Sequence, residues 1–319
     1  MGGLDVGIDV GGTFGDLIAV DRASGAVRVV KVPSAPADPS LAFLKALAAL
    51  GERLESVESL VHGTTVATNA IIQRRGAACG LIATRGFRDV LELRRRDRPR
   101  LYGLTGFFEP LIPREMRLEV EERTTPRGQV LVPVAEDDVR AAARALAAQG
   151  AAVIVVGFLH SYANPANERR ARQLIREVWP DGPVVLSSEV LPEIQEFERL
   201  STAVVNAAIL PIIGGYLTAL AAPLKERGFG RELLLVQSNG GVLAADLARR
   251  FPVTTILSGP AAGSWPAPGS RGPPASPTRS RATWAARAST SRSCGTPHRA
   301  SPRRSPWSSG SRSASRTST

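Results

Sequence analysis

The chain has 319 residues, of which 43% are hydrophobic and 22% charged, a composition typical of soluble globular proteins with one or two domains. The longest strongly apolar stretch, Ala151–Leu159, is too short to span a bilayer, and no signal-like pattern precedes the first apolar strand, so we expect no membrane association. Cys79 and Cys294 are the two cysteines and have no metal-ligand spacing. This excludes a disulfide framework and favours a cytoplasmic protein.

The formal net charge of +11 raises nucleic acid as a partner. Ten of the 40 basic residues lie in 264–319, which contains no acidic residue. The preceding 263 residues therefore carry 30 basic and 29 acidic side chains. Because the excess charge belongs to the tail alone, we expect no nucleic acid partner for the folded part.

The tail, 264–319, is rich in Arg, Ser, Pro and Ala without apolar periodicity, which predicts disorder. It could be a basic arm that binds RNA or another polyanion. However, if the codons are read in a frame that starts at the third base of each, they can encode a phosphate motif, DMGGTS, over Ala282–Ala288. The same shifted frame can encode the strand-like DVALVR over Ser289–Gly295. We therefore interpret the tail as a frameshift product.

The first part of the chain is predicted to begin with strands. A helix should follow Asp38-Pro39-Ser40, where leucines recur at helical spacing behind a polar cap. A second helix is expected over Val66–Arg74. β-branched and apolar runs predict strands at Leu4–Gly11, Asp16–Asp21, Ala26–Val32, 59–63 and Gly80–Arg85.

The second part alternates helices and strands, which predicts a mixed α/β sheet. Arg94–Arg127 is expected to be an irregular loop. The long helical stretch Glu193–Leu224 should break at Pro211 and Gly214-Gly215, and its Glu196, Glu198 and Arg199 should form surface ion pairs. The other predicted elements are helices at Glu136–Gln149 and Asn167–Val178, and strands at Ala151–Phe158, Pro183–Ser188 and Leu233–Gln237.

A glycine-rich turn separates the first two strands, in the sequence GIDVGGTFGDLIAVD. Gly11 and Gly12 let backbone N–H groups approach a phosphate, and Thr13 adds a hydroxyl. Asp9 and Asp16 flank the turn and could hold Mg²⁺. An ordinary hairpin with two exposed aspartates is the alternative, but the placement between two apolar strands favours a phosphate site.

A second polar cluster lies in VHGTTVATNAIIQRRGA, where a strand turns into a helix. His62, Thr64 and Thr65 would suit an anionic or carbonyl group. The alternative is a helix capped by Thr64 or Thr65, beside a histidine whose hydrogen bonds are satisfied.

Taken together, several motifs resemble those of hydantoinase A and 5-oxoprolinase, a group that also includes the beta subunits of acetone-type carboxylases. The resemblance covers 1–263 and implies an α/β, actin-like ATPase (RNase H-like) fold whose two halves close over ATP. The motifs are HGTTVATNA, TRGFRDVLEL, SSEVLPEIQEFERLSTAVVNAAILP, QSNGG and LSGPAAG.

The resemblance implies ATP-dependent hydrolysis of a cyclic amide, a hydantoin or 5-oxoproline, through phosphorylation of the carbonyl oxygen. It also implies a partner subunit of the hydantoinase B type. Phosphate and Mg²⁺ would be handled by Asp9, Gly11, Gly12, Thr13 and Asp16. The catalytic candidates are Asp9, on the phosphate side, and His62, Thr64 and Thr65, on the carbonyl side.

The same resemblance divides the chain into an N-terminal RNase H-like domain, 1–190, the start of a second domain, 191–263, and the tail. Gly15 stands where the family typically has threonine, which should remove one hydroxyl from the phosphate turn. The second phosphate motif and the adenosine-binding segment are absent, so we expect an incomplete fold and a truncated, poorly active or inactive product.

Other functions remain open at this point. A subunit of an ATP-dependent acetone- or acetophenone-type carboxylase would share the same motifs. A non-catalytic RNase H-like protein with a polyanion-binding tail is a second alternative. A sugar or acyl kinase is disfavoured by the HGTT and QSNGG segments.

Overall fold

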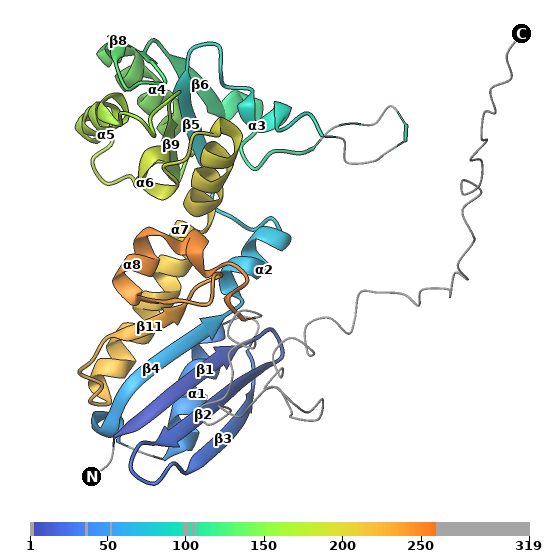
Figure 1. The fold of residues 1–319 in the computed structure, drawn as a ribbon, viewed down its shortest axis with the longest axis vertical. Helices are drawn as coiled ribbons and strands as arrows, with labels where there is room; N and C mark the ends of the chain where they lie inside the picture. Colours follow the sequence, from blue (N-terminus) through green and yellow to red (C-terminus); the bar gives the residue numbers. More distant parts are fainter. Residues whose placement is uncertain are drawn as a thin grey trace, which may run out of the picture.

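The computed structural model describes residues 3–35, 38–51, 53–97, 102, 103, 106 and 108–259. The tail 264–319, with its predicted disorder and frameshift, lies outside the described residues. Figure 1 shows two lobes stacked along the long axis of the molecule and joined by the helix α7, Glu196–Glu226.

The first lobe is built on a six-stranded sheet with the order β12-β11-β4-β1-β2-β3. β1 is antiparallel to β2 and parallel to β4, and β4 is parallel to β11. Alternate residues of β1, from Leu4 to Val10, are buried against α1 (Pro39–Leu50) and α7. The strands are β1 Leu4–Val10, β2 Phe14–Asp21, β3 Val27–Pro33, β4 Val57–Thr64, β11 Leu233–Val236 and β12 Val242–Ala244.

The second lobe is inserted between α2 (Val66–Ile72) and α7, and its parallel sheet has the order β10-β9-β5-β6. The two central strands are buried along their whole length, as expected for a sheet with helices on both faces. Its strands are β5 Cys79–Thr84, β6 Arg117–Val120, β9 Val153–Gly157 and β10 Val184–Leu186, with a small hairpin of β7 Arg123–Thr124 and β8 Val130–Val132. Its helices are α3 Val90–Leu93, α4 Glu136–Ala148, α5 Ala166–Val178 and α6 Ser187–Val190.

Helix α7 packs into both hydrophobic cores. Its first half, from Leu200 to Ala208, belongs to the core of the inserted lobe, and its second half, from Ile209 to Leu224, belongs to the core of the first lobe. By length and composition it is the one helix of the described residues that could cross a membrane, but 56% of its most apolar window is buried inside the protein. Its hydropathy is therefore accounted for by these two cores.

The predicted break in this helix is wrong, because α7 continues through Pro211. A proline inside a helix leaves a preceding carbonyl without its usual N–H partner. For Pro211 this is the carbonyl of Ala207, whereas the neighbouring Ala208 carbonyl accepts a hydrogen bond of 2.8 Å from the N–H of Ala77. Because the helix is buried in one core before Pro211 and in the other core after it, packing holds it together where the local sequence predicted a break.

Two further expectations are corrected by the structure. The supposed irregular loop contains β6, an edge strand paired with β5. The expected ion pair of Arg199 with Glu196 is present at 3.8 Å, but Arg199 is fully buried rather than on the surface, and its guanidinium donates to the carbonyls of Glu193 and Phe158 at 2.6 and 3.2 Å. Backbone carbonyls replace the water that an exposed guanidinium would bind.

The segment expected to begin a second domain, 191–263, contributes to both lobes. It supplies α7, then β11 and β12, which complete the sheet of β1–β4, and finally α8 (Ala245–Arg250). Short 3₁₀ turns are found at Leu54–Ser56, Arg114–Met116 and Pro252–Thr255.

Candidate functional site

The candidate site lies at one edge of the first sheet, where the carboxyl ends of the parallel strands β1, β4 and β11 meet. Asp9 is opposite Gly63 of β4 on one side and Asp16 of β2 on the other. This is the edge at which ligands of open parallel sheets bind. The predicted phosphate turn and the HGTT segment are thus brought together.

In the turn after β1, one backbone N–H group is hydrogen-bonded within the turn and the next two are not. The N–H of Gly11 donates to the carbonyl of Phe14 at 3.0 Å, whereas the N–H groups of Gly12 and Thr13 bond to no described residue. A Cβ added at Gly12 would meet no atom within 4 Å. The backbone can therefore be approached closely by an anion at this turn.

Asp9, which lies in β1 just before the turn, has a carboxylate oxygen without a hydrogen-bond partner in the described part of the chain. Its Oδ1 is buried and has no hydrogen-bond partner among the described residues. Burial, followed by the charge of Asp16, raises the pKa of Asp9. Asp16 itself has a counter-ion, since its Oδ1 lies 3.0 Å from Nζ of Lys31. A cation beside Asp9 would relieve both causes of its raised pKa.

Thr65 and Gly259 approach Asp9 from two other segments. The Thr65 hydroxyl donates to the carbonyl of Val10 at 3.3 Å. A Cβ added at Gly259 would lie 3.6 Å from Thr65 Cγ2 and 3.7 Å from Asp9 Oδ1. The described residues contain no group of three His, Cys, Asp or Glu side chains suited to a metal, so Asp9 and Asp16 would need other ligands, such as water or phosphate oxygens, to complete a magnesium site.

The segment that ends at Gly259 is tied to the end of β4 by side chains. The Ser258 hydroxyl donates to the carbonyl of Thr64 at 2.9 Å, and the N–H of Leu257 donates to Thr68 Oγ1 at 2.9 Å. Leu257 has a φ of 61°, which is a rare conformation for a non-glycine residue. Such outliers cluster at functional sites and persist where neighbouring contacts fix them, as these hydrogen bonds do.

His62 and Thr64 face the interior rather than the open turn. His62 is fully buried, with Nδ1 3.1 Å from the carbonyl of Ile8 and Nε2 2.7 Å from the hydroxyl of Tyr216. A carbonyl only accepts, so Nδ1 carries the proton and Nε2 accepts from the tyrosine. Burial lowers the pKa of His62 to about 4, which keeps the ring neutral.

Thr64 is also buried. Its Oγ1 accepts from the N–H of Val66 at 3.2 Å, at the start of α2. Donors and acceptors alternate from Tyr216 through His62 to Ile8, and these bonds join α7, β4 and β1. They position the ends of the strands without facing the turn.

The absence of a threonine at position 15 has a different consequence from the one predicted. A Cβ at Gly15 would point at Val32 Cγ2, 3.3 Å away, and at Ala42 of α1, 3.6 Å away. It would enter the packing between β2, β3 and α1 rather than the phosphate turn. The expectation that Gly15 removes a hydroxyl from the turn is therefore wrong.

Sequence reasoning missed three members of this site. Tyr216 carried no signal, because an aromatic residue on an apolar helix face is usually packed in the core. Ser258 and Gly259 belong to the quoted LSGPAAG motif, but they approach Thr64 and Asp9 across 194 and 250 residues of sequence. No local pattern predicts such a contact.

Comparison with known proteins identifies the family. Residues 5–179 match the hydantoinase/oxoprolinase N-terminal region, and residues 199–267 match hydantoinase/oxoprolinase. The caprolactamase subunit alpha of Pseudomonas jessenii is 36% identical over 267 residues, covering 80% of this chain and 38% of that one. The 5-oxoprolinase of Saccharomyces cerevisiae is 28% identical over 304 residues, covering 82% of this chain and 23% of that one.

Two solved structures share the fold. An ATP-dependent caprolactamase from P. jessenii superimposes with a TM-score of 0.75 and 34% identity, covering 82% of this chain and 39% of that one. A nucleotide-free acetone carboxylase gives 0.73 and 32%, covering 82% and 40%. The chain thus spans about two fifths or less of the length of these relatives. The predicted actin-like ATPase type of fold is confirmed, and the chain belongs to the hydantoinase/oxoprolinase family.

Proposed function

We propose that this chain carries a phosphate-binding part of an ATP-dependent hydrolase that opens a cyclic amide of the hydantoin or 5-oxoproline type. The observation that carries the proposal is the buried, unpartnered carboxylate oxygen of Asp9 beside an open glycine turn. A buried charge without a partner costs stability. Such a group is understandable where a bound cation and phosphate complete the site.

The residues fit Mg²⁺ and ATP phosphates in their chemistry. The N–H groups of Gly12 and Thr13 would hold phosphate oxygens, because neither has a partner among the described residues. Asp9 and Asp16 would hold the cation, directly or through water. The Lys31 ammonium on Asp16 limits the negative charge of this pair, which favours Asp9 as the principal ligand.

When bound, ATP would supply the phosphoryl group that makes the amide carbonyl oxygen a better leaving group. The contribution of this chain is positioning and electrostatics. The Thr65 hydroxyl already donates to the carbonyl of Val10 and accepts from the amide of Asn69, both at 3.3 Å, so Thr65 would fix the backbone beside Asp9 rather than donate to an incoming carbonyl group. His62 and Thr64 would act indirectly, by fixing the ends of β1 and β4.

The test uses the full chain with Asp9→Asn and, as a matched control, Asp181→Asn, which removes the same charge from an exposed loop. Binding of Mg·ATP is measured by calorimetry. ADP release is measured with hydantoin, 5-oxoproline or caprolactam, with and without a hydantoinase B-type subunit. We expect Asp9→Asn to lose magnesium-dependent ATP binding and Asp181→Asn to keep it. Equal binding by both variants would refute the role of Asp9.

A second candidate is a subunit of an ATP-dependent ketone carboxylase, favoured by the similarity to acetone carboxylase. Both activities would use the same phosphate turn, so substrate specificity separates them. ADP release that depends on acetone or acetophenone plus bicarbonate, and not on cyclic amides, would support the carboxylase. The cytoplasm is the proposed place of action, consistent with a free, buried thiol at Cys79.

A further inference from the structure

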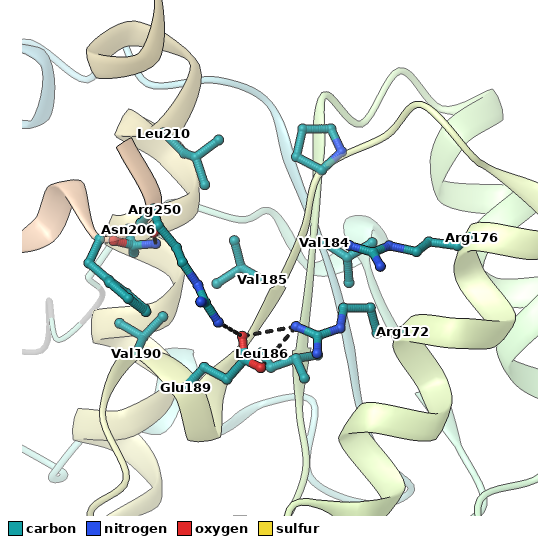
Figure 2. A pocket seen from close by; sticks show the side chains of 12 residues that line it. Arg172, Arg176, Val184, Val185, Leu186, Glu189, Val190, Asn206, Leu210 and Arg250 are labelled. Carbon is teal, nitrogen blue, oxygen red and sulfur yellow. Dashed lines mark hydrogen bonds and ion pairs between the residues drawn. The ribbon is translucent and has the colours of Figure 1, made fainter. Parts of the chain in front are cut away.

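A second pocket, distant in sequence from the phosphate turn, lies where the two lobes meet (Figure 2). Its volume is about 460 Å³, within the range of small-molecule sites. One wall is formed by α5, β10 and α6 of the inserted lobe, and the other by α7 and α8.

Charged side chains from both walls converge on one carboxylate. Arg172 of α5 lies 2.9 Å from Glu189 Oε2, and Arg250 of α8 lies 3.1 Å from the same oxygen. Figure 2 shows the two guanidinium groups reaching Glu189 from opposite sides. Burial alone would raise the pKa of Glu189, but the hydrogen bonds from Arg172 and Arg250 lower it, so the carboxylate is ionised.

The pocket nevertheless has a surplus of positive charge. Arg176 also lines it, one turn along α5 from Arg172, and makes no hydrogen bond or ion pair with any described residue. Three arginines and one carboxylate thus line the pocket, which leaves two positive charges. Guanidinium groups are suited to carboxylate and phosphate oxygens, which they can bind in a bidentate way.

The remaining lining is mainly apolar. Val190, Leu210 and Phe251 are half-buried and contribute hydrocarbon to the walls. The amide of Asn206 is already used, since it donates to the Arg250 carbonyl at 3.2 Å and accepts from the N–H of Val253 at 3.1 Å. An inorganic anion would leave these apolar walls without a partner, whereas an anion with a hydrocarbon body would cover them.

We propose that this pocket binds a small anion with an apolar body, a carboxylate or a phosphate monoester, between Arg176 on the inserted lobe and Arg250 on the first lobe. The anionic group lies among the three arginines and the body lies against Val190, Leu210 and Phe251. Because the arginines come from both lobes, the ligand links them. The site is separate from the phosphate turn and does not depend on the proposed function.

The experiment measures binding to the full chain by calorimetry, with hexanoate, phenyl phosphate, inorganic phosphate and uncharged hexanamide as probes. The variants are Arg176→Gln and Arg250→Gln. The matched control is Arg169→Gln, which removes the same charge from α5 at an exposed position outside the pocket. The Asp9→Asn protein is included to separate this pocket from the phosphate turn.

We expect hexanoate or phenyl phosphate to bind, and the one that binds more tightly identifies the anionic group. Arg176→Gln and Arg250→Gln should each weaken binding about tenfold or more, as for the loss of a charged hydrogen bond. Arg169→Gln and Asp9→Asn should leave it unchanged, and hexanamide should not bind.

Equal weakening by Arg169→Gln, or equal affinity for inorganic phosphate, would overturn the proposal. Binding that survives Arg250→Gln would overturn the link between lobes, and failure of both hexanoate and phenyl phosphate to bind would overturn the site itself.

Discussion

Replacing Asp9 by asparagine should make the folded protein more stable at neutral pH while abolishing its proposed function. The substitution keeps the shape of the side chain but removes a charge that is buried, close to Asp16 and unpartnered at Oδ1. Functional sites commonly retain such unfavourable groups, at a cost in stability. A residue with a purely structural role would behave in the opposite way.

The size of the effect follows from the burial of one unpartnered polar atom, which costs about 1–3 kcal/mol. Asparagine remains polar, so we expect a gain of about 1–2 kcal/mol. For a domain of this size each kcal/mol shifts Tm by about 2–4 °C, so the melting temperature should rise by roughly 2–8 °C.

The pH dependence gives a second, independent readout. The pKa of Asp9 is raised in the folded state, so the folded protein binds this proton more tightly than the unfolded chain. Protonation therefore stabilises the fold below the ordinary aspartate pKa, and this contribution is lost as the pH rises through the folded-state pKa. The advantage of Asp9→Asn should be largest at neutral pH and should shrink towards zero in acid.

Thermal unfolding followed by circular dichroism at about pH 7 and about pH 4 measures both effects, with Asp181→Asn as the control. Millimolar Mg²⁺ with ATP should raise the Tm of the wild type and not that of Asp9→Asn. A lower Tm for Asp9→Asn than for wild type at neutral pH would show that Oδ1 makes a structural bond, and the reasoning would fail.

Three substitutions test the packing of α7, each by urea denaturation. Tyr216→Phe should cost about 1–3 kcal/mol, because Nε2 of His62 loses its buried donor, and an unchanged midpoint would argue against the network. Gly157→Ala should cost about 1–3 kcal/mol, since its Cβ would lie 2.9 Å from Leu200 Cγ between β9 and α7. Gly215→Ala, within α7 but with no atom within 4 Å of the new Cβ, should instead stabilise by about 0.5–1 kcal/mol. If the two alanines behave alike, β9 and α7 do not pack as described.

Much of the site could be predicted locally. The turn around Gly11 and Gly12 was recognisable because β-strands with a glycine turn between them have a clear pattern, and the structure places this turn at the end of β1. Asp38 was predicted to begin a helix, and its carboxylate accepts from the N–H of Ser40 in the structure. These features depend on neighbours within a few residues, which is why the sequence alone indicates them.

Other features needed contacts between distant segments. β11 joins the sheet beside β4 after an insertion of more than a hundred residues, and Ser258 reaches Thr64. His62 was considered either as a group facing a bound carbonyl or as a satisfied histidine, and the structure shows it buried and bonded to Tyr216 of α7. The orientation of the His62 side chain could not be predicted from the motif, because nothing in the motif distinguished its buried polar residues from its exposed ones.

The sequence by itself determined the family, the order of most elements and the glycine turn after β1, because these depend on local backbone preference and on motifs of adjacent residues. Tertiary structure alone decided that Arg199 is buried, that α7 runs through Pro211 and that Gly15 faces α1. In each case the deciding energy comes from burial and hydrogen bonding to residues far along the chain. Local propensities are weak compared with these contacts, so packing overrides them.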